Sequence, residues 1–131
     1  NKYVAGFIGS PEMNFFEGVI DGDHFETRGV RVPTTGYAFA GGRSDGPAWF
    51  GIRPEHIRAG DEARDMPFTF DSVVDIVEPM GSDTLVWAKV SDHDIRFRMD
   101  GQAKVKHGDP IRIGFSAAHA SMFDKSSEKR L

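Results

Sequence analysis

Cysteine is absent from this sequence of 131 residues. Without cysteine the chain has no disulfide framework, no thiolate zinc site and no cysteine nucleophile, and this composition fits a reducing compartment. Uninterrupted apolar runs are only a few residues long, whereas a membrane helix needs about 20 residues, and no targeting segment is recognised after Asn1. We therefore expect a cytoplasmic chain. Its start without methionine is what a piece of a longer polypeptide would show.

Nucleotide-binding motifs are also missing. No two of the 15 glycines are separated by a single residue, and no glycine precedes Lys followed by Ser or Thr, so the dinucleotide and phosphate-loop patterns are excluded. The segment Gly42-Arg43-Ser44-Asp45-Gly46 matches the formal G-x-S-x-G pattern of a hydrolase elbow. Pro47 and a short strand pattern follow it, so we interpret it as an exposed loop. We expect no enzyme activity and no ATP binding by this chain alone.

The sequence lacks an excess of positive charge. The 20 Asp and Glu residues outnumber the 16 Lys and Arg residues, which gives a formal charge of −4. Binding to a phosphate backbone needs clustered cations. Arg96 and Arg98 flank Phe97, but alternation along a strand points Phe97 away from both arginines. We therefore expect a solvated face for the two arginines and no nucleic-acid partner.

Clustered histidines and carboxylates raise the question of a metal site. The segment Asp92-His93-Asp94 is the densest cluster, but three consecutive residues point in different directions and rarely converge on one ion. The remaining histidines have no mutual ligand spacing; they are His24, His56, His107 and His119. We interpret the cluster as a polar turn between two strands. We expect no metal and no other cofactor in this chain.

The apolar pattern changes its period early in the chain. Tyr3, Val4, Phe7 and Ile8 recur at spacings of three and four and predict a short helix over residues 1–10. After it, period-two patterns and an Asp21-Gly22 turn predict strands; these cover residues 15–20, 24–27, 30–32, 48–52 and 85–90. Many short strands of this spacing predict a mainly β fold, a closed or nearly closed antiparallel barrel.

The second half of the chain has the clearest strand patterns. Phe68, Phe70, Val74 and Ile76 are expected on one face of a long strand that ends at Pro79 and Gly81. Apolar residues then alternate with polar ones in two further strands, with Ile95, Phe97 and Met99 in the first and Ile111, Ile113 and Phe115 in the second. We expect Phe97 and Ile113 to face the core together.

The segment Gly51-Ile52-Arg53-Pro54-Glu55-His56 ends a strand with a proline-fixed turn that carries three ionisable or titratable side chains. A purely structural loop needs only the turn. Physical reasoning leaves two interpretations open, a rigid corner and a contact loop.

Three stretches together resemble one protein family. They read YVAGFIGSPEMNF over residues 3–15, GIRPEH over residues 51–56 and VEPMGSDT over residues 77–84. The similarity continues through Gly108-Asp109, Ile113-Gly114, His119 and Met122-Phe123-Asp124 to Arg130-Leu131. In this order the segments are similar to the C-terminal domain of sugar-type ABC importer ATPases, which include the maltose and glycerol-3-phosphate transporter ATP-binding subunits.

The resemblance implies a transport-associated (TOBE) domain, a β-rich and tandem OB-like barrel that forms a single regulatory domain over residues 1–131. Residues 1–10 would link it to an upstream ATPase domain that holds ATP and Mg, and residues 125–131 would form a polar tail. The parent polypeptide would then be an ABC transporter ATPase. Residues 35–47 and 120–123 depart from the family pattern, which leaves carbohydrate, polyol or glycerol phosphate open as the substrate.

The resemblance also implies partners and contact residues. The partners are a second copy through this domain, the chain's own ATPase domain, permease subunits at the inner face of the membrane, and a cytoplasmic regulator. The implied regulatory and dimer contacts are Arg53, Glu55, His56, Glu78, Gly81, Ser82, Gly108, Gly114 and Phe123. An exposed phenylalanine among them would anchor a partner. The alternative, in which the glycines serve turns and Phe123 fills the core, stays open.

Two other functions remain as alternatives. Relatives of this barrel in molybdate uptake bind oxyanions, so the chain could be a small-ligand or oxyanion sensor domain of an importer, although it is acidic and shows no obvious anion nest. A free-standing OB-fold binder of nucleic acid or glycan would need a basic or aromatic-lined groove. A Walker motif in the preceding residues would distinguish the importer reading from the others.

Overall fold

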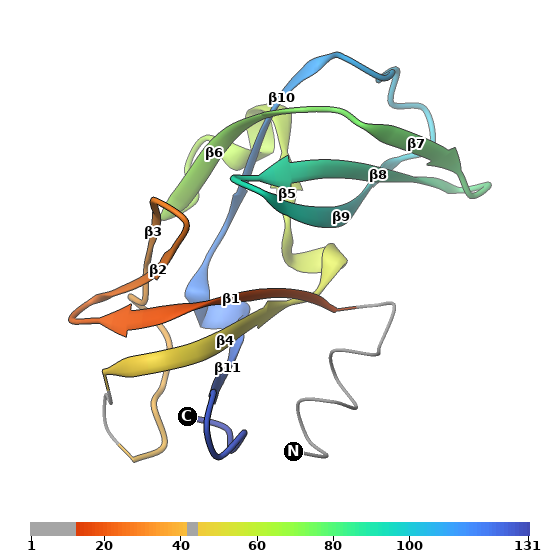
Figure 1. Ribbon diagram of the computed structural model, residues 1–131. Coiled ribbons are helices and arrows are strands. Elements are labelled where there is room, and N and C mark those ends of the chain that lie inside the picture. The colour runs from red at the N-terminus through yellow and green to blue at the C-terminus, as the bar shows by residue number, and fades with distance from the viewer. Residues whose placement is uncertain (1–12, 42–44) are drawn as a thin grey trace. The chain divides into compact units, whose positions relative to one another are not determined.

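The structure is a computed structural model, and it describes residues 13–41 and 45–131. The helix expected over residues 1–10 and most of the Gly42–Gly46 motif lie outside the described residues. The described residues form short strands, which Figure 1 shows, and three brief 3-10 helices, so the mainly β class is confirmed. In the described part of the chain, no helix is long and apolar enough to span a bilayer.

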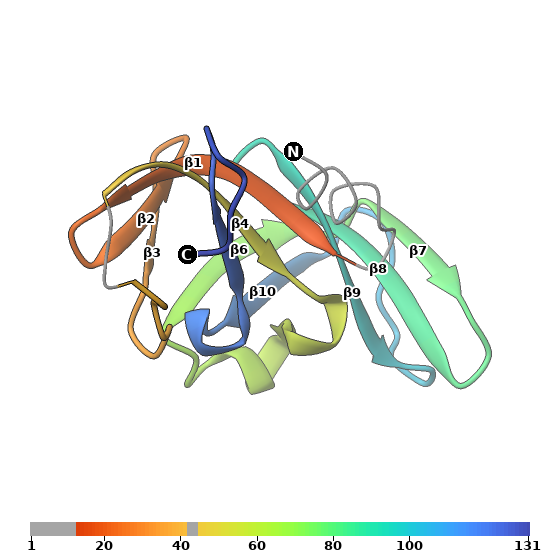
Figure 2. The same ribbon diagram turned by 90° about the horizontal axis from the view of Figure 1, so that it is seen from below.

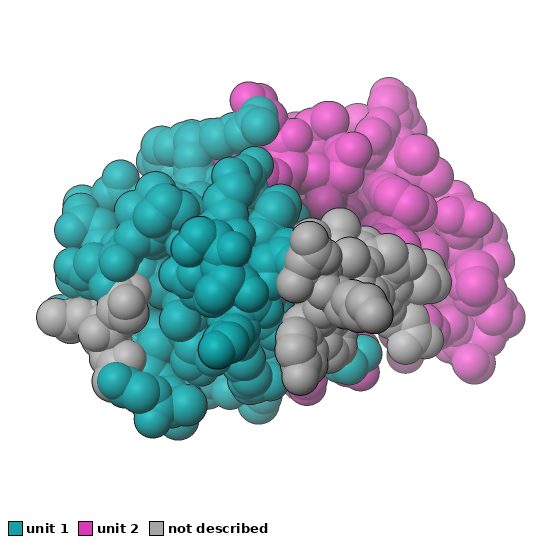
Figure 3. Space-filling view, turned by 60° about the horizontal axis from the view of Figure 1, so that its bottom comes forward, with its two compact units in different colours: residues 1–53, 116–131 teal, residues 54–115 magenta. Residues whose placement is uncertain are grey.

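Two compact units make up the chain, as Figure 3 shows by colour. Unit 1 comprises residues 1–53 and 116–131, and unit 2 comprises residues 54–115. The strands pair into three separate sheets, and each sheet lies within one unit. None of the three closes into a ring within the described ranges. The single regulatory domain over residues 1–131 stays a prediction.

Unit 1 contains a five-stranded sheet with the strand order β11-β4-β1-β2-β3. Its strands are β1 (Asn14–Asp21), β2 (His24–Thr27), β3 (Val30–Pro33), β4 (Gly46–Ile52) and β11 (Ser121–Asp124), and the 3-10 helix η3 (Ala117–His119) precedes β11. The predicted β1–β2 hairpin is confirmed, with its two-residue turn one position later than expected, at Gly22-Asp23. Gly22 has a φ of 63°, which glycine adopts without steric cost.

Residues 125–131 fold back instead of extending as a tail. The Leu131 amide donates to the Met122 carbonyl at 2.8 Å, and Arg130 forms a β-bridge with Phe123. The Asp124 carboxylate accepts hydrogen bonds from the Ser127 amide and from the Ser126 and Ser127 hydroxyls. The C-terminal segment is therefore part of unit 1, although its composition is polar.

Unit 2 contains two three-stranded sheets. The first has the order β5-β10-β6, with β5 (Arg58–Ala59), β6 (Phe68–Val73) and β10 (Pro110–Phe115); the second has the order β7-β8-β9, with β7 (Ile76–Pro79), β8 (Asp83–Val90) and β9 (His93–Asp100). Two 3-10 helices, η1 (Pro54–His56) and η2 (Gly60–Ala63), come before β6. Phe97 and Ile113 are both fully buried, as expected from the alternation in their strands.

The long strand expected over residues 68–79 is wrong, because the chain breaks it into β6 and β7. The Val74 amide donates to the Asp109 carbonyl, and its carbonyl accepts from the Gly108 amide, both at 2.8 Å. The next amide, of Asp75, donates to the Trp87 carbonyl of β8. The backbone thus changes partner between the two sheets. Val74 is buried, whereas Ile76, expected on the same buried face, is 47% exposed.

Candidate functional site

The outward side of the β7–β8–β9 sheet carries apolar and charged side chains in two aligned rows. Figure 2 shows the three strands side by side. In the pairing register one row runs Ile76–Trp87–Arg96 and the other runs Glu78–Leu85–Arg98. The alternate residues of β8 and β9 are buried on the other side; they are Val86, Ala88, Ile95 and Phe97. We call the six outward residues of the two rows the Trp87 face.

Trp87 lies at the centre of contacts on this face. Its indole Nε1–H donates to Glu78 Oε1 at 3.0 Å, and the Arg96 guanidinium lies over the ring, 5.3 Å from the centroid. A guanidinium stacked on an indole gains a favourable cation–π interaction. Arg98 donates to the Asp83 carboxylate at 3.2 Å. The face therefore combines an apolar centre with a charged rim, an arrangement typical of protein interfaces.

A further ion pair lies beside this face. Lys89 Nζ is 3.0 Å from Asp94 Oδ1. This hydrogen bond and the negative charge of Asp94 raise the pKa of Lys89. The pair spans the end of the β8–β9 hairpin, whose turn is Ser91-Asp92. A polar turn does join the two strands, but it lies earlier than expected: of Asp92-His93-Asp94 only Asp92 is in the turn, and His93 and Asp94 belong to β9.

The implied contact residues Glu78, Gly81 and Ser82 lie together on the β7–β8 hairpin. Gly81 has a φ of 91°, and the Met80 amide donates to the Asp83 carbonyl at 2.9 Å across the turn. The Ser82 carbonyl accepts from the Gly101 amide at 3.1 Å. Gly81 is thus required by the turn itself, while Glu78 holds Trp87.

Gly108 and Gly114 have structural reasons to be glycine. Gly108 lies in the loop before β10 and has a φ of 90°. Its amide donates a hydrogen bond to the Val74 carbonyl. In that loop, hydrogen bonding to the Lys106 amide lowers the pKa of Asp109. Gly114 lies in β10, where an added Cβ would come within 2.9 Å of the Ala63 and Phe68 carbonyl oxygens. Their implied contact roles stay predictions.

Arg53, Glu55 and His56 follow strand β4. Arg53 belongs to unit 1, whereas Glu55 and His56 form η1 in unit 2 behind the buried Pro54. The Arg58 guanidinium donates to the Glu55 carbonyl at 3.1 Å. This is the geometry of a rigid corner. Glu55 is also exposed, so a partner could reach its side chain. The contact-loop interpretation therefore stays open as well.

Of the two interpretations left open for Phe123, an exposed contact and a core position, the structure favours the core position. Its side chain is 1% exposed, and its ring centroid lies 6.3 Å from that of Phe15. The residue sits on β11 opposite Trp49 of β4, within the core of unit 1. Burial of the ring removes apolar surface from water and leaves no surface for a partner to contact.

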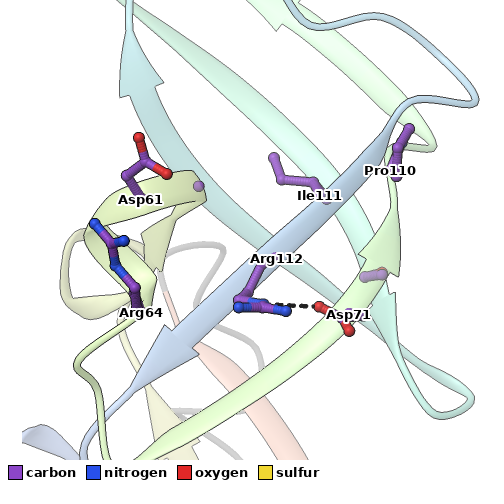
Figure 4. A pocket seen from close by; sticks show the side chains of 8 residues that line it. Asp61, Arg64, Asp71, Pro110, Ile111 and Arg112 are labelled. Atoms are coloured by element: carbon purple, nitrogen blue, oxygen red, sulfur yellow. Dashed lines mark hydrogen bonds and ion pairs between the residues drawn. The ribbon is translucent and has the colours of Figure 1, made fainter.

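A cavity in unit 2 has a volume of about 550 Å³ and lies beside η2, β6 and β10. Figure 4 shows Asp61 and Arg64 on the η2 side and Arg112 pointing at Asp71 across the two strands. The Arg112 Nε–H donates to Asp71 Oδ1 at 2.9 Å, and this bond raises the pKa of Arg112. The cavity is lined by two arginines and two aspartates, so it has no excess of positive charge. Within the described ranges, no group of three or more His, Asp or Glu residues could hold a metal ion.

Apart from Glu78, which the resemblance implied as a contact, the residues of the Trp87 face and of this cavity were not among the sites expected from the sequence. The cavity combines residues from three distant segments, and no local pattern indicates that they meet. The Trp87 face does leave a signal, because Leu85 and Trp87 occupy positions where a half-buried strand normally carries polar residues. Their alternation with Val86 and Ala88 predicts a strand that is apolar on both sides.

Family models match consecutive parts of this chain. Residues 9–57 match the MalK OB fold domain, and residues 50–123 match the TOBE domain. In solved structures, a molybdate-bound form of the cytoplasmic molybdate-binding protein ModG has a similar fold, with a TM-score of 0.69 over 87% of this chain and 97% of that chain. Its sequence identity is 9%, so the likeness concerns the fold alone.

Several curated relatives are named as import or transport ATP-binding proteins. The xylose/arabinose import protein XacK of Haloferax volcanii is 37% identical over 95% of this chain. The sn-glycerol-3-phosphate import protein UgpC of Burkholderia pseudomallei is 33% identical and the multiple sugar-binding transport protein MsmK of Streptococcus mutans is 32% identical, each over 98% of this chain. The chain spans about a third of the length of these relatives, 33% of XacK and 36% of the other two.

The mainly β fold, the two family models in succession and these relatives agree with one another. The chain therefore belongs to the TOBE domain family, in the form joined to a MalK-type OB fold that sugar and glycerol-3-phosphate ABC importer ATP-binding subunits carry.

Proposed function

We propose that this chain is the non-catalytic regulatory and dimerisation domain of the ATP-binding subunit of an ABC importer. The observation that carries the proposal is the succession of MalK OB fold and TOBE matches over residues 9–123. The relatives cover nearly the whole chain, and their names assign them to import of xylose and arabinose, to transport of multiple sugars and to import of sn-glycerol-3-phosphate. A carbohydrate, a polyol or glycerol phosphate is accordingly the proposed cargo of the parent transporter.

The proposed mechanism needs no chemistry on this chain. Two paired copies hold the upstream ATPase domains together between hydrolysis cycles, because a tether makes their meeting an intramolecular event at high effective concentration. ATP and Mg are bound by those upstream domains. The parent protein works at the inner face of the membrane with permease subunits. A cytoplasmic regulator that binds one arrangement of the paired copies better than another would shift the transporter toward that state.

Two measurements on the 131-residue chain test this function. Isothermal titration with Mg-ATP is expected to give no binding heat, and sedimentation equilibrium is expected to show a reversible dimer. Micromolar affinity for ATP, or a chain that stays monomeric at millimolar concentration, contradicts the proposal. In the full-length subunit, substitutions that prevent pairing of this domain are expected to leave ATP binding intact and to lower transport.

A second candidate is an oxyanion sensor, favoured by the presence of Arg64 and Arg112 at one cavity. Asp71 is hydrogen-bonded to Arg112, and Asp61 lines the same cavity, so an anion would meet two carboxylates there. Titration with molybdate, sulfate and phosphate decides between the candidates. Micromolar binding that is lost in Arg112→Gln supports the sensor, and the absence of binding supports the regulatory domain.

A further inference from the structure

We infer that the Trp87 face is the surface through which two copies of this chain pair, about a two-fold axis that runs along β8. The inference rests on the proposed dimerisation and identifies where it occurs. It is carried by the side chains that the β7–β8–β9 register brings to one face of the sheet.

The first observation is apolar surface on the outward side of the β7–β8–β9 sheet. Among the described residues, Ile76 is one of the four large hydrophobic side chains that are exposed, and it is 47% exposed. Ile76 pairs with Trp87 on the Trp87 face, and Leu85 occupies the same face in the next row. Trp and Arg are the residues most enriched at the centres of protein interfaces. An apolar centre of this kind is stabilised when a partner removes it from water.

The second observation is that the charges of the face match their own two-fold image. In the second row Glu78 lies on β7 and Arg98 on β9, one on each side of Leu85. A two-fold rotation about an axis parallel to β8 exchanges the places of β7 and β9 in the facing copy. Glu78 then faces the copy's Arg98, and Arg98 faces the copy's Glu78, while the central strands meet at Leu85 and Trp87. An isologous contact requires this self-complementarity.

The hydrogen bonds within the face leave capacity for these contacts. Glu78 uses Oε1 for the Trp87 indole, and among the described residues nothing donates to its Oε2. Arg98 uses one N–H for Asp83, and a guanidinium has five N–H donors in a planar fork. Both groups are therefore held in place by one bond and can make a second bond to the facing copy.

The same face fits other occupants less well. Together with the neighbouring Asp83, Lys89 and Asp94, the face and its rim carry three cationic and three anionic side chains, so they have no excess of positive charge for nucleic acid or an anionic membrane. Addition of a partner strand at the free edge of β7 is opposed by Pro79, which has no N–H to donate. The residues of the Trp87 face therefore favour a contact in which the side of this sheet packs against a second copy.

Charge reversal tests the pairing. The 131-residue chain is prepared as Glu78→Arg, as Arg98→Glu and as a control, Lys104→Glu, which reverses an exposed charge outside the face. In either single variant like charges face each other, and the dimer dissociation constant is expected to rise about 100-fold. In an equimolar mixture of the two variants every facing pair is again Glu with Arg, so a heterodimer is expected. Circular dichroism and thermal melting show that each variant is folded.

The outcomes separate the inference from the function on which it rests. Restored association in the mixture, with Lys104→Glu dimerising as the wild type, supports the Trp87 face. Single variants that dimerise like the wild type overturn the inference and leave the proposed dimerisation standing, since pairing then uses another surface. A wild-type chain that is monomeric at millimolar concentration overturns both. Folded single variants that stay monomeric when mixed overturn the two-fold register.

Discussion

The Tyr37 hydroxyl joins two segments that lie 94 residues apart, because it donates to the Leu131 carbonyl at 3.1 Å. The same oxygen accepts a hydrogen bond from the Met122 amide, also at 3.1 Å. Met122 is fully buried and belongs to β11, the edge strand of the unit 1 sheet. Tyr37 thus supplies a hydrogen-bond acceptor for the Met122 amide, which points away from β4 at the edge of the sheet.

Tyr37→Phe is expected to lower the free energy of unfolding by about 1 to 3 kcal/mol, because it leaves the buried Met122 amide without an acceptor. Urea denaturation measures the change. Tyr37→Leu is the companion variant, since it also removes the ring that packs on Phe39 with centroids 4.6 Å apart. A Tyr37→Phe variant as stable as the wild type would show that water replaces the hydroxyl.

Phe97→Ala is expected to destabilise the chain by about 3 to 5 kcal/mol, because a fully buried ring leaves a cavity. Arg96→Ala, one position along the same strand, is expected to cost under about 1 kcal/mol. Arg96 lies on the solvent side, over Trp87. Denaturant melts of the two variants rank them, and the reverse order would mean that the register of β9 is shifted by one residue.

Gly114→Ala is expected to destabilise unit 2, because its Cβ would meet two backbone carbonyl oxygens at 2.9 Å and the backbone must move. We expect a loss of about 1 to 3 kcal/mol, measured by chemical denaturation. Gly41→Ala is the matched control, since nothing lies within 4 Å of an added Cβ there. Equal stabilities of the two variants would rule out the close backbone approach at Gly114.

Phe123→Asp is expected to unfold the chain or to lower its melting temperature sharply, because a carboxylate would replace a ring that is almost fully buried. Val19→Asp, at a 44% exposed position of the same sheet, is the control and is expected to cost about 1 kcal/mol. Differential scanning fluorimetry compares them. Loss of self-association at an unchanged melting temperature would instead place Phe123 in a contact.

Acid is expected to weaken the C-terminal turn through Asp124. Hydrogen bonds from the Ser127 amide and then from the Ser126 and Ser127 hydroxyls lower the pKa of Asp124. A carboxyl with a lowered folded-state pKa stabilises the fold above its unfolded pKa of about 3.9, and this contribution disappears as pH falls through the folded pKa. The melting temperature of the wild type should therefore exceed that of Asp124→Asn at neutral pH, with the difference shrinking below about pH 4.

The control for this titration is Asp65→Asn, at an exposed position where none of the described residues hydrogen-bonds the carboxylate. Its difference from the wild type should stay small across the same pH range. A constant difference between the wild type and Asp124→Asn down to pH 2 would contradict the role of Asp124.

The period-two alternation of β9 and β10 predicted which of their residues are buried, and the Asp-Gly signal predicted the β1–β2 hairpin to within one position. These features are local, because side chains alternate along any strand and a two-residue turn depends on its own residues. The mainly β class depended on the same local patterns, whereas the family resemblance depended on matching stretches at residues 3–15, 51–56 and 77–84. Each could therefore be predicted from the sequence.

The tertiary structure decided which strands pair and hence where each side chain lies. The break at Val74-Asp75 arises because the loop before β10 and the Trp87 carbonyl of β8 hold the backbone at that point. Phe123 is buried because β11 pairs with β4, from which it is separated by more than 60 residues. The Trp87 face exists only when β7 and β9 flank β8 in the observed register. Such pairings depend on contacts between distant segments, and hydrophobic periodicity within one segment carries no information about them.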